Sequence, residues 1–254
     1  MVASIDTLDL ASTRVSAGGS LDDAAVAKRR ALECATVPVP VSLIRTDLAA
    51  FQDDCLRRLL TRYSGADIIG GWTKGPESNG VRVVRGDVEG SAWHSLCTTA
   101  TMPFSTDKAL RVLTDDTLLL QFDDMTKSAT VVEELSDETK IRVVSCKPVL
   151  FTSPRDFVTA TTRATAKDTG RILIATRSVD HPAGDREGYV RALSHISGYI
   201  LTPDAHDPNV CELSLIAHMD IGGNMPAKVI KYLGMSAPIK LVQKFRDVAI
   251  AARV

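Results

Sequence analysis

Few residues in this 254-residue sequence could carry out chemistry, and their spacing does not complete a catalytic motif. Ser105 to Lys108 fit S-x-x-K, a pattern in which a lysine activates a serine at the start of a helix. The partner motifs K-T-G and S-D-N are absent, as are G-x-S-x-G, H-E-x-x-H, a P-loop and G-x-G-x-x-G. We therefore expect Ser105 to cap a helix and not to act as a nucleophile.

Arginine and histidine side chains provide the remaining candidates for chemistry. An enzyme would need a cluster of perturbed titratable groups inside a cavity, and the candidates are Arg142, His195 and His94. His206 and His218 each lie near an aspartate, but a two-residue cluster does not hold a metal ion. We predict no metal, no cofactor and no enzymatic activity, although triads that assemble only on folding leave little trace in a sequence.

Composition narrows the class of protein. The net charge is −1 and aromatic residues make up 5%, which argues against a nucleic-acid partner. Five scattered cysteines without a C-x-x-C pair are typical of reduced thiols in a cytosolic protein. No apolar run approaches the ~20 residues of a membrane-spanning helix, and the first twenty residues do not resemble a secretory signal. We predict a cytoplasmic monomer.

Hydrophobic periodicity divides the chain into a flexible leader, residues 1–40 with a possible short helix over 21–35, and one domain, residues 41–254. Apolar residues at three- or four-residue spacing predict a helix over 42–65 that ends at Gly65. Three strands with an Asn79-Gly80 turn and two short helices follow. Six more strands are expected over residues 126–135, 138–146, 156–166, 171–179, 189–202 and 209–220.

The last segment, residues 222–254, is predicted to be helical, with a kink or break near Gly234 and Pro238. Short turns between strands imply an antiparallel sheet, whose apolar face this helix can cover. If the sheet curls strongly around the helix, the space between them is either filled core or a ligand tunnel.

An apolar stretch lies between two prolines in KPVLFTSPRDFV, residues 147–158. Loops are usually polar, so Val149, Leu150 and Phe151 need an explanation. They either pack inside as the end of a strand or form a tip that contacts a lipid bilayer, where Lys147 and Arg155 could meet anionic headgroups.

Several motifs occur in a specific order: Gly71-Trp72, DDTLLLQFDD (115–124), SPRDFV (153–158), YVRA (189–192), GYILTP (198–203) and HMDIGGNMP (218–226). Together they resemble the START domain family of StAR-related lipid-transfer proteins, from about Leu43 to Arg253. The resemblance implies an α+β helix-grip fold, in which a curved antiparallel sheet of about nine strands wraps around a long C-terminal helix. It also implies an internal lipid cavity, gated at a membrane surface by the 147–154 loop and the last helix.

The resemblance also locates cavity positions. Sterol-carrying members place a buried acid and an arginine on adjacent strands, and these positions fall here at Arg142 and Thr161, so the pair is not reproduced as such. Arg142 could meet a phospholipid phosphate, or it could lie exposed on the outer face of the sheet. Arg155 and Asp156 are expected to pin the loop to neighbouring backbone. The other residues expected to line the cavity are Ser194, His195, Tyr199, Ile230, Leu233, Ala237 and Leu241.

These observations favour a lipid-binding and lipid-transfer protein that shields one phospholipid or sterol-like molecule and exchanges it with membranes. The predicted partners are a lipid and, transiently, a membrane surface. Two alternatives stay open: a cyclase-like enzyme built on the same cavity, and a scaffold whose outer surface changes when lipid binds.

Overall fold

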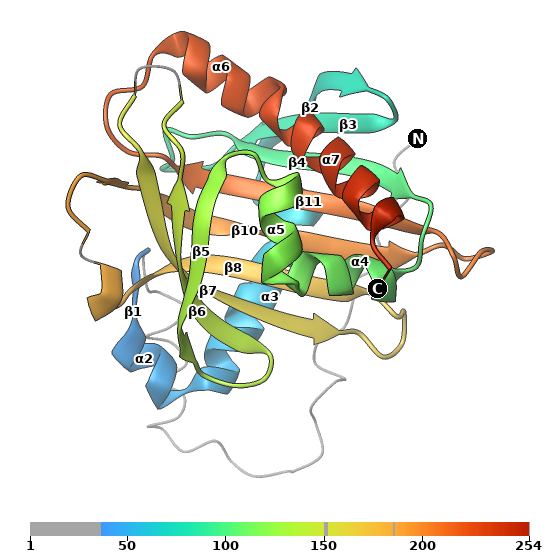
Figure 1. The fold of residues 1–254 in the computed structure, drawn as a ribbon, viewed down its shortest axis with the longest axis horizontal. Coiled ribbons are helices and arrows are strands. Elements are labelled where there is room, and N and C mark those ends of the chain that lie inside the picture. Colours follow the sequence, from blue (N-terminus) through green and yellow to red (C-terminus); the bar gives the residue numbers. More distant parts are fainter. Residues whose placement is uncertain (1–36, 150–151, 185, 254) are drawn as a thin grey trace.

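The computed structural model of the protein describes residues 37–253 apart from 150, 151 and 185 (Figure 1). Its helices are α2 (Val41–Thr46), α3 (Leu48–Ser64), α4 (Thr106–Thr114), α5 (Asp116–Phe122), α6 (Ala227–Met235) and α7 (Ala237–Ala251), with a 3-10 helix, η2, over Pro182–Gly184. Its strands are β1 (Val39–Pro40), β2 (Ile69–Ser78), β3 (Val81–Asp87), β4 (Ser95–Met102), β5 (Thr126–Glu134), β6 (Thr139–Cys146), β7 (Arg155–Thr165), β8 (Ile172–Asp180), β9 (Val190–Arg191), β10 (Leu193–Pro203) and β11 (Cys211–Asp220).

One curved antiparallel sheet organises the domain. Nine strands follow the order β2-β3-β4-β11-β10-β8-β7-β6-β5, and the short strands β1 and β9 pair in parallel with β8 and β7. Hairpins connect most neighbours, and the Asn79-Gly80 turn has positive φ at both residues, 51° and 73°. The pairing of β4 with β11 joins the first three strands to the rest of the sheet.

Helix α3 covers one face of the sheet. The Asp47 side chain accepts a hydrogen bond from the backbone N–H of Ala50, and Gly65 ends the helix with φ 76°. The apolar stripe predicted from sequence is buried: Phe51, Cys55 and Leu59 pack on the sheet. We call this side of the sheet the α3 face; α3 lies behind the sheet in Figure 1.

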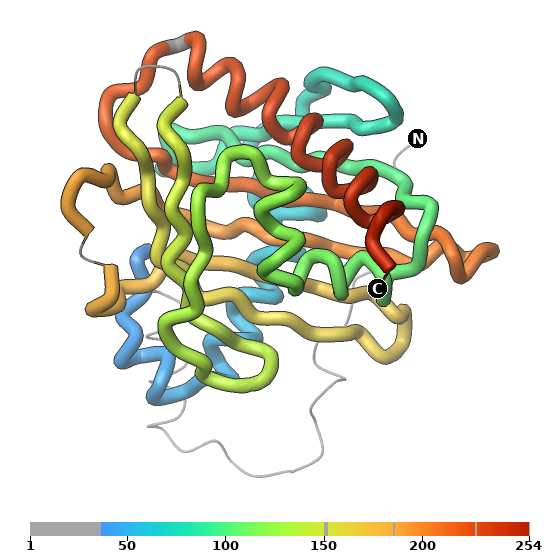
Figure 2. Tube along the Cα trace, viewed as in Figure 1, coloured from blue at the N-terminus to red at the C-terminus, as the bar shows by residue number. Residues whose placement is uncertain are grey.

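Helices α4, α5 and α7 lie on the opposite, concave face, in front of the sheet in Figures 1 and 2. The Ser105 side chain accepts a hydrogen bond from the Lys108 backbone N–H, as expected of a helix cap. The C-terminal helix is broken at Ser236 into α6 and α7, and Pro238 occupies the first turn of α7, where its missing N–H costs nothing.

The predicted fold class is therefore confirmed: an α+β helix-grip arrangement with nine strands in the main path of the sheet. Val39 and Pro40 pair with the sheet, just before the expected domain start at residue 41. The leader with its possible helix over 21–35 lies outside the described residues up to residue 36.

Candidate functional site

The concave face has two halves of different character. The half beneath α4, α5 and α7 is closed core, where strand residues such as Leu201 and Leu213 are fully buried. Phe245 of α7 contacts Phe122 and Phe104 edge to face, with ring centroids 5.4 and 6.0 Å apart. This half is filled by the protein's own side chains.

The other half is lined by small hydroxyl side chains. Side chains alternate along a strand, so these hydroxyl side chains point to the same face of the sheet as Ile174 and Tyr199, which pack in the core beneath α7. We call this set the hydroxyl floor; it consists of Thr159 and Thr161 on β7, Thr176 and Ser178 on β8, and Ser194 and Ser197 on β10.

Strand register makes the hydroxyl floor continuous. Thr161 pairs with Thr176, and Thr176 pairs with Ser197. The Thr161 and Thr176 hydroxyl oxygens lie 2.9 Å apart, and the Ser194 hydroxyl donates to that of Ser197 at 2.9 Å. Serine and threonine fill less volume than the Ile, Leu and Phe of the other half, so the floor stands back from the helices.

Residues of this half keep accessible surface although strands flank them on both sides. Thr161, Thr176, Ser197, Tyr199 and Ala217 are only half-buried, whereas their neighbours that point to the α3 face are mostly buried. Burial raises the pKa of Tyr199 well above its ordinary value, with a smaller contribution from the charge of Asp123. The protein's own side chains therefore do not cover this part of the concave face completely.

Arg142 borders the floor and already has a carboxylate partner. It pairs with Thr159 in the β6–β7 register, and its Nη1 donates to Asp116 Oδ1 of α5 at 2.7 Å. Of the two positions expected for Arg142, the cavity side and the outer face, its contact with α5 favours the cavity side. The acid of this pair comes from a helix and not from the adjacent strand. The Nε of Arg142 is buried without a partner among the described residues.

His195 does not line the concave face, which corrects the prediction. A bulge between Ser194 and Ile196 interrupts the alternation of β10, so His195 turns to the α3 face. There its ring stacks on that of His218, 4.5 Å away, and burial lowers its pKa. Ser194, in contrast, points to the hydroxyl floor.

The predicted face of the C-terminal helix changes at the break. Ile230 is 42% exposed, so it is not a lining residue; Val229 is the buried residue of α6. Leu233 and Ala237 are half-buried on either side of Ser236, and Leu241 packs partly against the α7 core. The break predicted near Gly234 and Pro238 lies at Ser236, but the apolar periodicity did not show that α6 buries Val229 and exposes Ile230.

The 147–154 connection lies at the same end of the molecule as the segment before α6 (Figure 2). Arg155 donates to the backbone oxygens of Ile221 and Gly222, at 3.3 and 3.4 Å, and it also contacts Met225. Arg155 is 8% exposed, so it does not reach a headgroup, whereas Lys147 is exposed.

The ends of this connection are fixed by side chains. Asp156 accepts two hydrogen bonds from Arg191, at 2.9 and 3.1 Å. The Thr152 hydroxyl donates to the Val149 carbonyl at 2.8 Å. Leu150 and Phe151, at the predicted membrane-contacting tip, lie outside the described residues.

Groups that could support catalysis do not converge. His94 is exposed and contacts Asp87 at the surface, far in sequence from Arg142 on the concave face. The Lys108 ammonium donates to the Ala252 carbonyl at 3.0 Å and not to Ser105. No cluster of three metal-ligating side chains occurs among the described residues, and no described helix is long and apolar enough to cross a membrane.

Sequence reasoning missed Asp116, Thr159, Thr176 and Ser178. The signal was present as hydroxyl residues two apart in both β7 and β8, where apolar side chains would be expected on a core face. Asp116 could not be found because its position opposite Arg142 depends on how α5 packs against β5 and α7.

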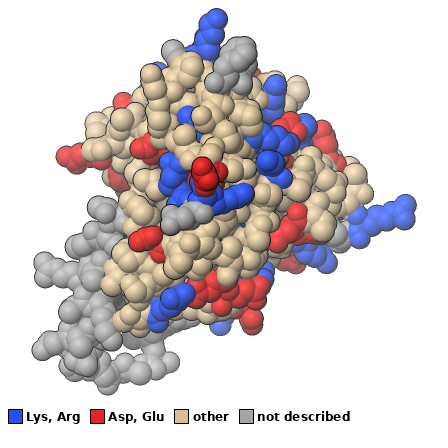
Figure 3. Space-filling view, turned by 60° about the vertical axis from the view of Figure 1, so that its left-hand side comes forward, with Lys and Arg blue, Asp and Glu red and all other residues tan. Residues whose placement is uncertain are grey.

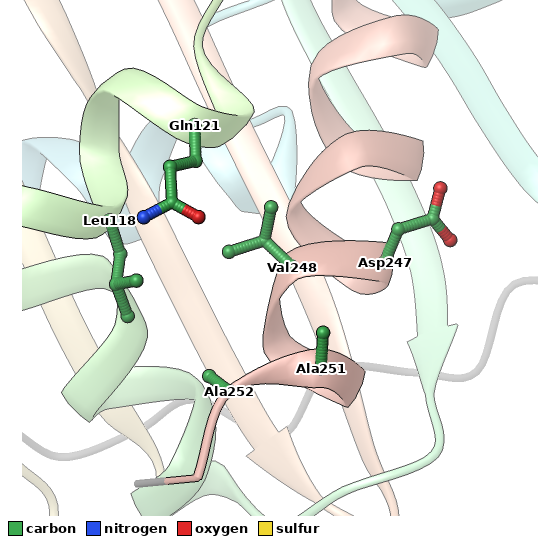
Figure 4. Close-up of a pocket in the computed structure, with 6 residues that line it drawn as sticks. All are labelled: Leu118, Gln121, Asp247, Val248, Ala251 and Ala252. Atoms are coloured by element: carbon green, nitrogen blue, oxygen red, sulfur yellow. The ribbon is translucent and has the colours of Figure 1, made fainter.

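Two further hollows lie on the surface. One is a groove between α5 and α7, lined by Leu118, Gln121, Asp247, Val248, Ala251 and Ala252 (Figure 4). The other lies between β2 and α6, beside Tyr232 and Met235. In Figure 3 acidic and basic side chains are interspersed with uncharged surface, so no field of one sign covers that face.

Comparison with known proteins places this architecture in a family. Residues 70–249 match the profile of the START domain. The mitochondrial steroidogenic acute regulatory protein of Danio rerio is 26% identical over 124 residues, which are 48% of this chain and 43% of that protein, so the match spans less than half of this relative.

Two human structures share the fold. Human StAR-related lipid transfer protein 5 has a TM-score of 0.71 at 19% identity, covering 80% of this chain and 97% of that one. Human STARD10 has a TM-score of 0.69 at 20% identity, covering 87% and 84%. Since the family profile matches most of the domain and the architecture agrees, the chain belongs to the START domain family.

Proposed function

We propose that this protein binds one lipid molecule between the hydroxyl floor and α6 and exchanges it with membranes, without covalent chemistry. The observation that carries the proposal is that the two halves of the concave face differ. The half beneath α7 is closed core, whereas residues of the central strands in the other half, such as Ser197, Tyr199 and Ala217, are only half-buried. Names of similar proteins agree, since one is a lipid transfer protein. Binding would be driven by removing the hydrocarbon of the lipid from water.

The structure suggests how the site would open. Gly222 and Gly223, with φ of 61° and 65°, precede α6, and Ser236 separates it from α7, so these are the two places at which α6 could turn. Its exposed Ile230 and Met235 and its exposed Lys228 and Lys231 suit a membrane surface. We therefore propose that α6 is the lid, and that it moves relative to the 147–154 loop during transient contact with a membrane.

The test combines lipid capture with transfer. Protein purified from cells is examined by native mass spectrometry, and the rate of lipid transfer between vesicles is measured. We expect a lipid-sized mass increase and transfer. Leu150→Asp and Phe151→Asp should each slow transfer about tenfold or more, because burying such a side chain contributes roughly 1.5–3 kcal/mol to membrane contact.

Leu120→Asp is the matched control, because Leu120 is an exposed apolar residue on α5, outside the loop and the lid. It should leave the transfer rate unchanged. A protein that captures no lipid and transfers none would contradict the proposed function, whereas equal rates for all three variants would contradict only the role of the loop tip.

A further inference from the structure

We propose that the protein binds one internal water molecule between α3 and the sheet, at a site formed by Arg62 of α3, Ser95 of β4 and His218 of β11. The site lies on the α3 face, opposite to the concave face, so the inference does not depend on the proposed lipid site. It follows from three buried polar atoms, from the strand register that brings their residues together, and from the donors and acceptors that these atoms present.

Three buried side chains each carry a polar atom without a hydrogen-bond partner in the part of the chain that the structure describes. The atoms are Nη1 of Arg62, the hydroxyl oxygen of Ser95 and Nδ1 of His218. These residues are 5%, 0% and 3% exposed, so bulk solvent does not reach the three atoms. Leaving a buried polar atom unpaired is costly, and internal water commonly pairs such atoms where side chains do not.

The fold brings the three residues to one place. Continued by one residue, the register of β4 and β11 sets Ser95 opposite His218. Both side chains point to the α3 face, because Cys97 and Ile216, two positions away on the same strands, pack in the core beneath α3. Burial is the largest cause of the lowered pKa of His218, and the charge of Arg62 is the next, so these two side chains lie near each other.

The three atoms match the hydrogen-bonding capacity of water. The Ser91 hydroxyl donates to the Trp93 carbonyl, so in the 2.9 Å contact between Ser91 and His218 the histidine Nε2 is the donor, and Nδ1 is left as an acceptor. Nη1 of Arg62 can only donate, whereas the Ser95 hydroxyl can donate or accept. A water molecule can accept from Arg62, donate to His218 and bond to Ser95, which makes about three hydrogen bonds, as buried waters typically do.

An ion matches these atoms less well. Nε of Arg62 donates to both carboxylate oxygens of Asp67, at 2.9 and 3.0 Å, so the guanidinium already has a counter-charge. The unprotonated Nδ1 of His218 would direct its lone pair at an anion, and the charge of Arg62 would repel a cation. A neutral molecule that both donates and accepts satisfies all three atoms, and water is the one that solvent supplies.

The bound water would join segments that lie far apart in the sequence. It completes a hydrogen-bonded path from Arg62, near the end of α3, through His218 to Ser91 and Trp93 in the connection between β3 and β4. With both ring nitrogens bonded, the His218 imidazole is fixed in one orientation beneath α3. The water is thus a structural ligand of the α3 face.

A high-resolution crystal structure tests the assignment on the unmodified protein. We expect a solvent peak within about 2.7–3.2 Å of Nη1 of Arg62, the Ser95 hydroxyl and Nδ1 of His218. Absence of this peak, or direct hydrogen bonds among the three side chains, would overturn the inference. Crystals grown in bromide distinguish water from an anion, because an anomalous peak at this position would identify a halide site and would also overturn the inference.

Oxygen-17 relaxation dispersion counts long-lived internal waters in solution. Ser95→Val replaces the hydroxyl with a methyl group and should lower the count by one. Thr99→Val is the matched control: Thr99 lies on the same strand and the same face, and its hydroxyl contacts Cys97, so the count should not change. An unchanged count in Ser95→Val, or an equal loss in both variants, would contradict the site. If Ser95→Val does not fold, the crystal structure of the wild type decides.

Discussion

Asp54 is a carboxylate buried beneath α3, where it neutralises several arginines. It accepts hydrogen bonds from Arg177 at 2.8 Å and from Arg58 at 2.7 Å, and it also contacts Arg57. Arg177 is itself 2% exposed, and burial lowers its pKa. Removing one charge of a buried pair is costly because it leaves the other uncompensated in a medium of low polarity.

Asp54→Ala should therefore lower the free energy of unfolding by about 3 kcal/mol. Asp53→Ala is the control, since Asp53 is the preceding residue of the same helix but is exposed, and we expect a change within about 0.5 kcal/mol. Urea denaturation of the two variants measures both values. Similar stabilities would mean that the Asp54 carboxylate does not hold α3 to β8.

His218 has a defined tautomer. The Ser91 hydroxyl donates to the Trp93 carbonyl at 3.0 Å, so the contact of 2.9 Å between Ser91 and Nε2 of His218 needs the histidine as donor. Nδ1 then carries no proton, and it is buried without a partner among the described residues. Burial, followed by the charges of Arg62 and His195, lowers the pKa of His218 to about 3.

This depressed pKa predicts the sign of a pH dependence. An unfolded chain protonates His218 near pH 6.5, whereas the folded chain does so only near pH 3, so the unfolded state binds more protons between these values. The stabilisation is complete above pH 6.5 and is lost as the pH falls towards 3, with a slope of up to about 1.4 kcal/mol per pH unit.

Urea denaturation at several pH values from 7 to 4 measures this slope. His218→Gln should reduce it, while His206→Gln, an exposed residue of the β10–β11 loop, should retain it. If the stability of the wild type and of the His218 variant changed with pH in the same way, the pH dependence would not arise from His218.

Individual residues were harder to place from sequence than their neighbours in the same strand. Thr161 was expected in the cavity from the resemblance, and Tyr199 either in a cavity or in the core; both lie on the concave side. Alternation allowed only one of Ser194 and His195 to face inward, but it could not show which, because the bulge between Ser194 and Ile196 changes the phase and leaves no signal in composition. The counter-charge of Arg142 was also not predictable, because Asp116 reaches it through helix packing.

At the scale of elements, the residues that begin and end helices explain most of the helix boundaries. Asp47, Ser105 and Asp115 each accept a backbone hydrogen bond at the start of a helix, and Gly65 ends α3. The recurrence of Val, Ile and Thr at every second position predicted the bounds of the strands to within a few residues of those in the structure. The break in the C-terminal helix was predicted from Gly234 and Pro238, but which residues of α6 are buried depends on tertiary contacts.

Gly234 allows a prediction about α6. A methyl group added there would meet no atom within 4 Å, and the residue is helical, so Gly234→Ala should raise the free energy of unfolding by about 0.5–1 kcal/mol. If α6 is the lid, the same change should slow lipid transfer, because the end of the helix becomes stiffer.

Thermal unfolding and the vesicle assay measure the two effects on one protein. The contrasting variant is Gly198→Ala: the new methyl group would lie 1.9 Å from the Ile174 carbonyl, so this protein should lose stability by about 3 kcal/mol. A faster transfer by a stabilised Gly234 variant would argue against the lid.

The whole molecule has little net charge, yet one end of it is basic. The sequence carries a net charge of −1, so a uniform field does not attract it to anionic membranes. Lys147 and Lys240 lie close enough to Asp124 to lower the pKa of its carboxyl, after the stronger hydrogen bond from Lys244, and Lys228 and Lys231 are exposed on α6. Lysines therefore surround the end at which the lid and the loop meet.

This asymmetry predicts how the molecule orients on a membrane. Replacing Lys228 and Lys231 together with Gln should weaken binding to vesicles that contain phosphatidylserine by about 30-fold at low salt, because each lysine near such a surface contributes about 1 kcal/mol. Sedimentation with vesicles measures the affinity. Lys167→Gln, in the exposed turn after β7 at the other end of that strand, should leave the affinity unchanged.

Salt tests whether the effect is electrostatic. At 0.5 M salt the wild type and the double variant should bind vesicles with the same affinity, because charges are then screened within about 5 Å. If the difference persists at high salt, the lysines act through packing of α6 and not by attraction to the membrane.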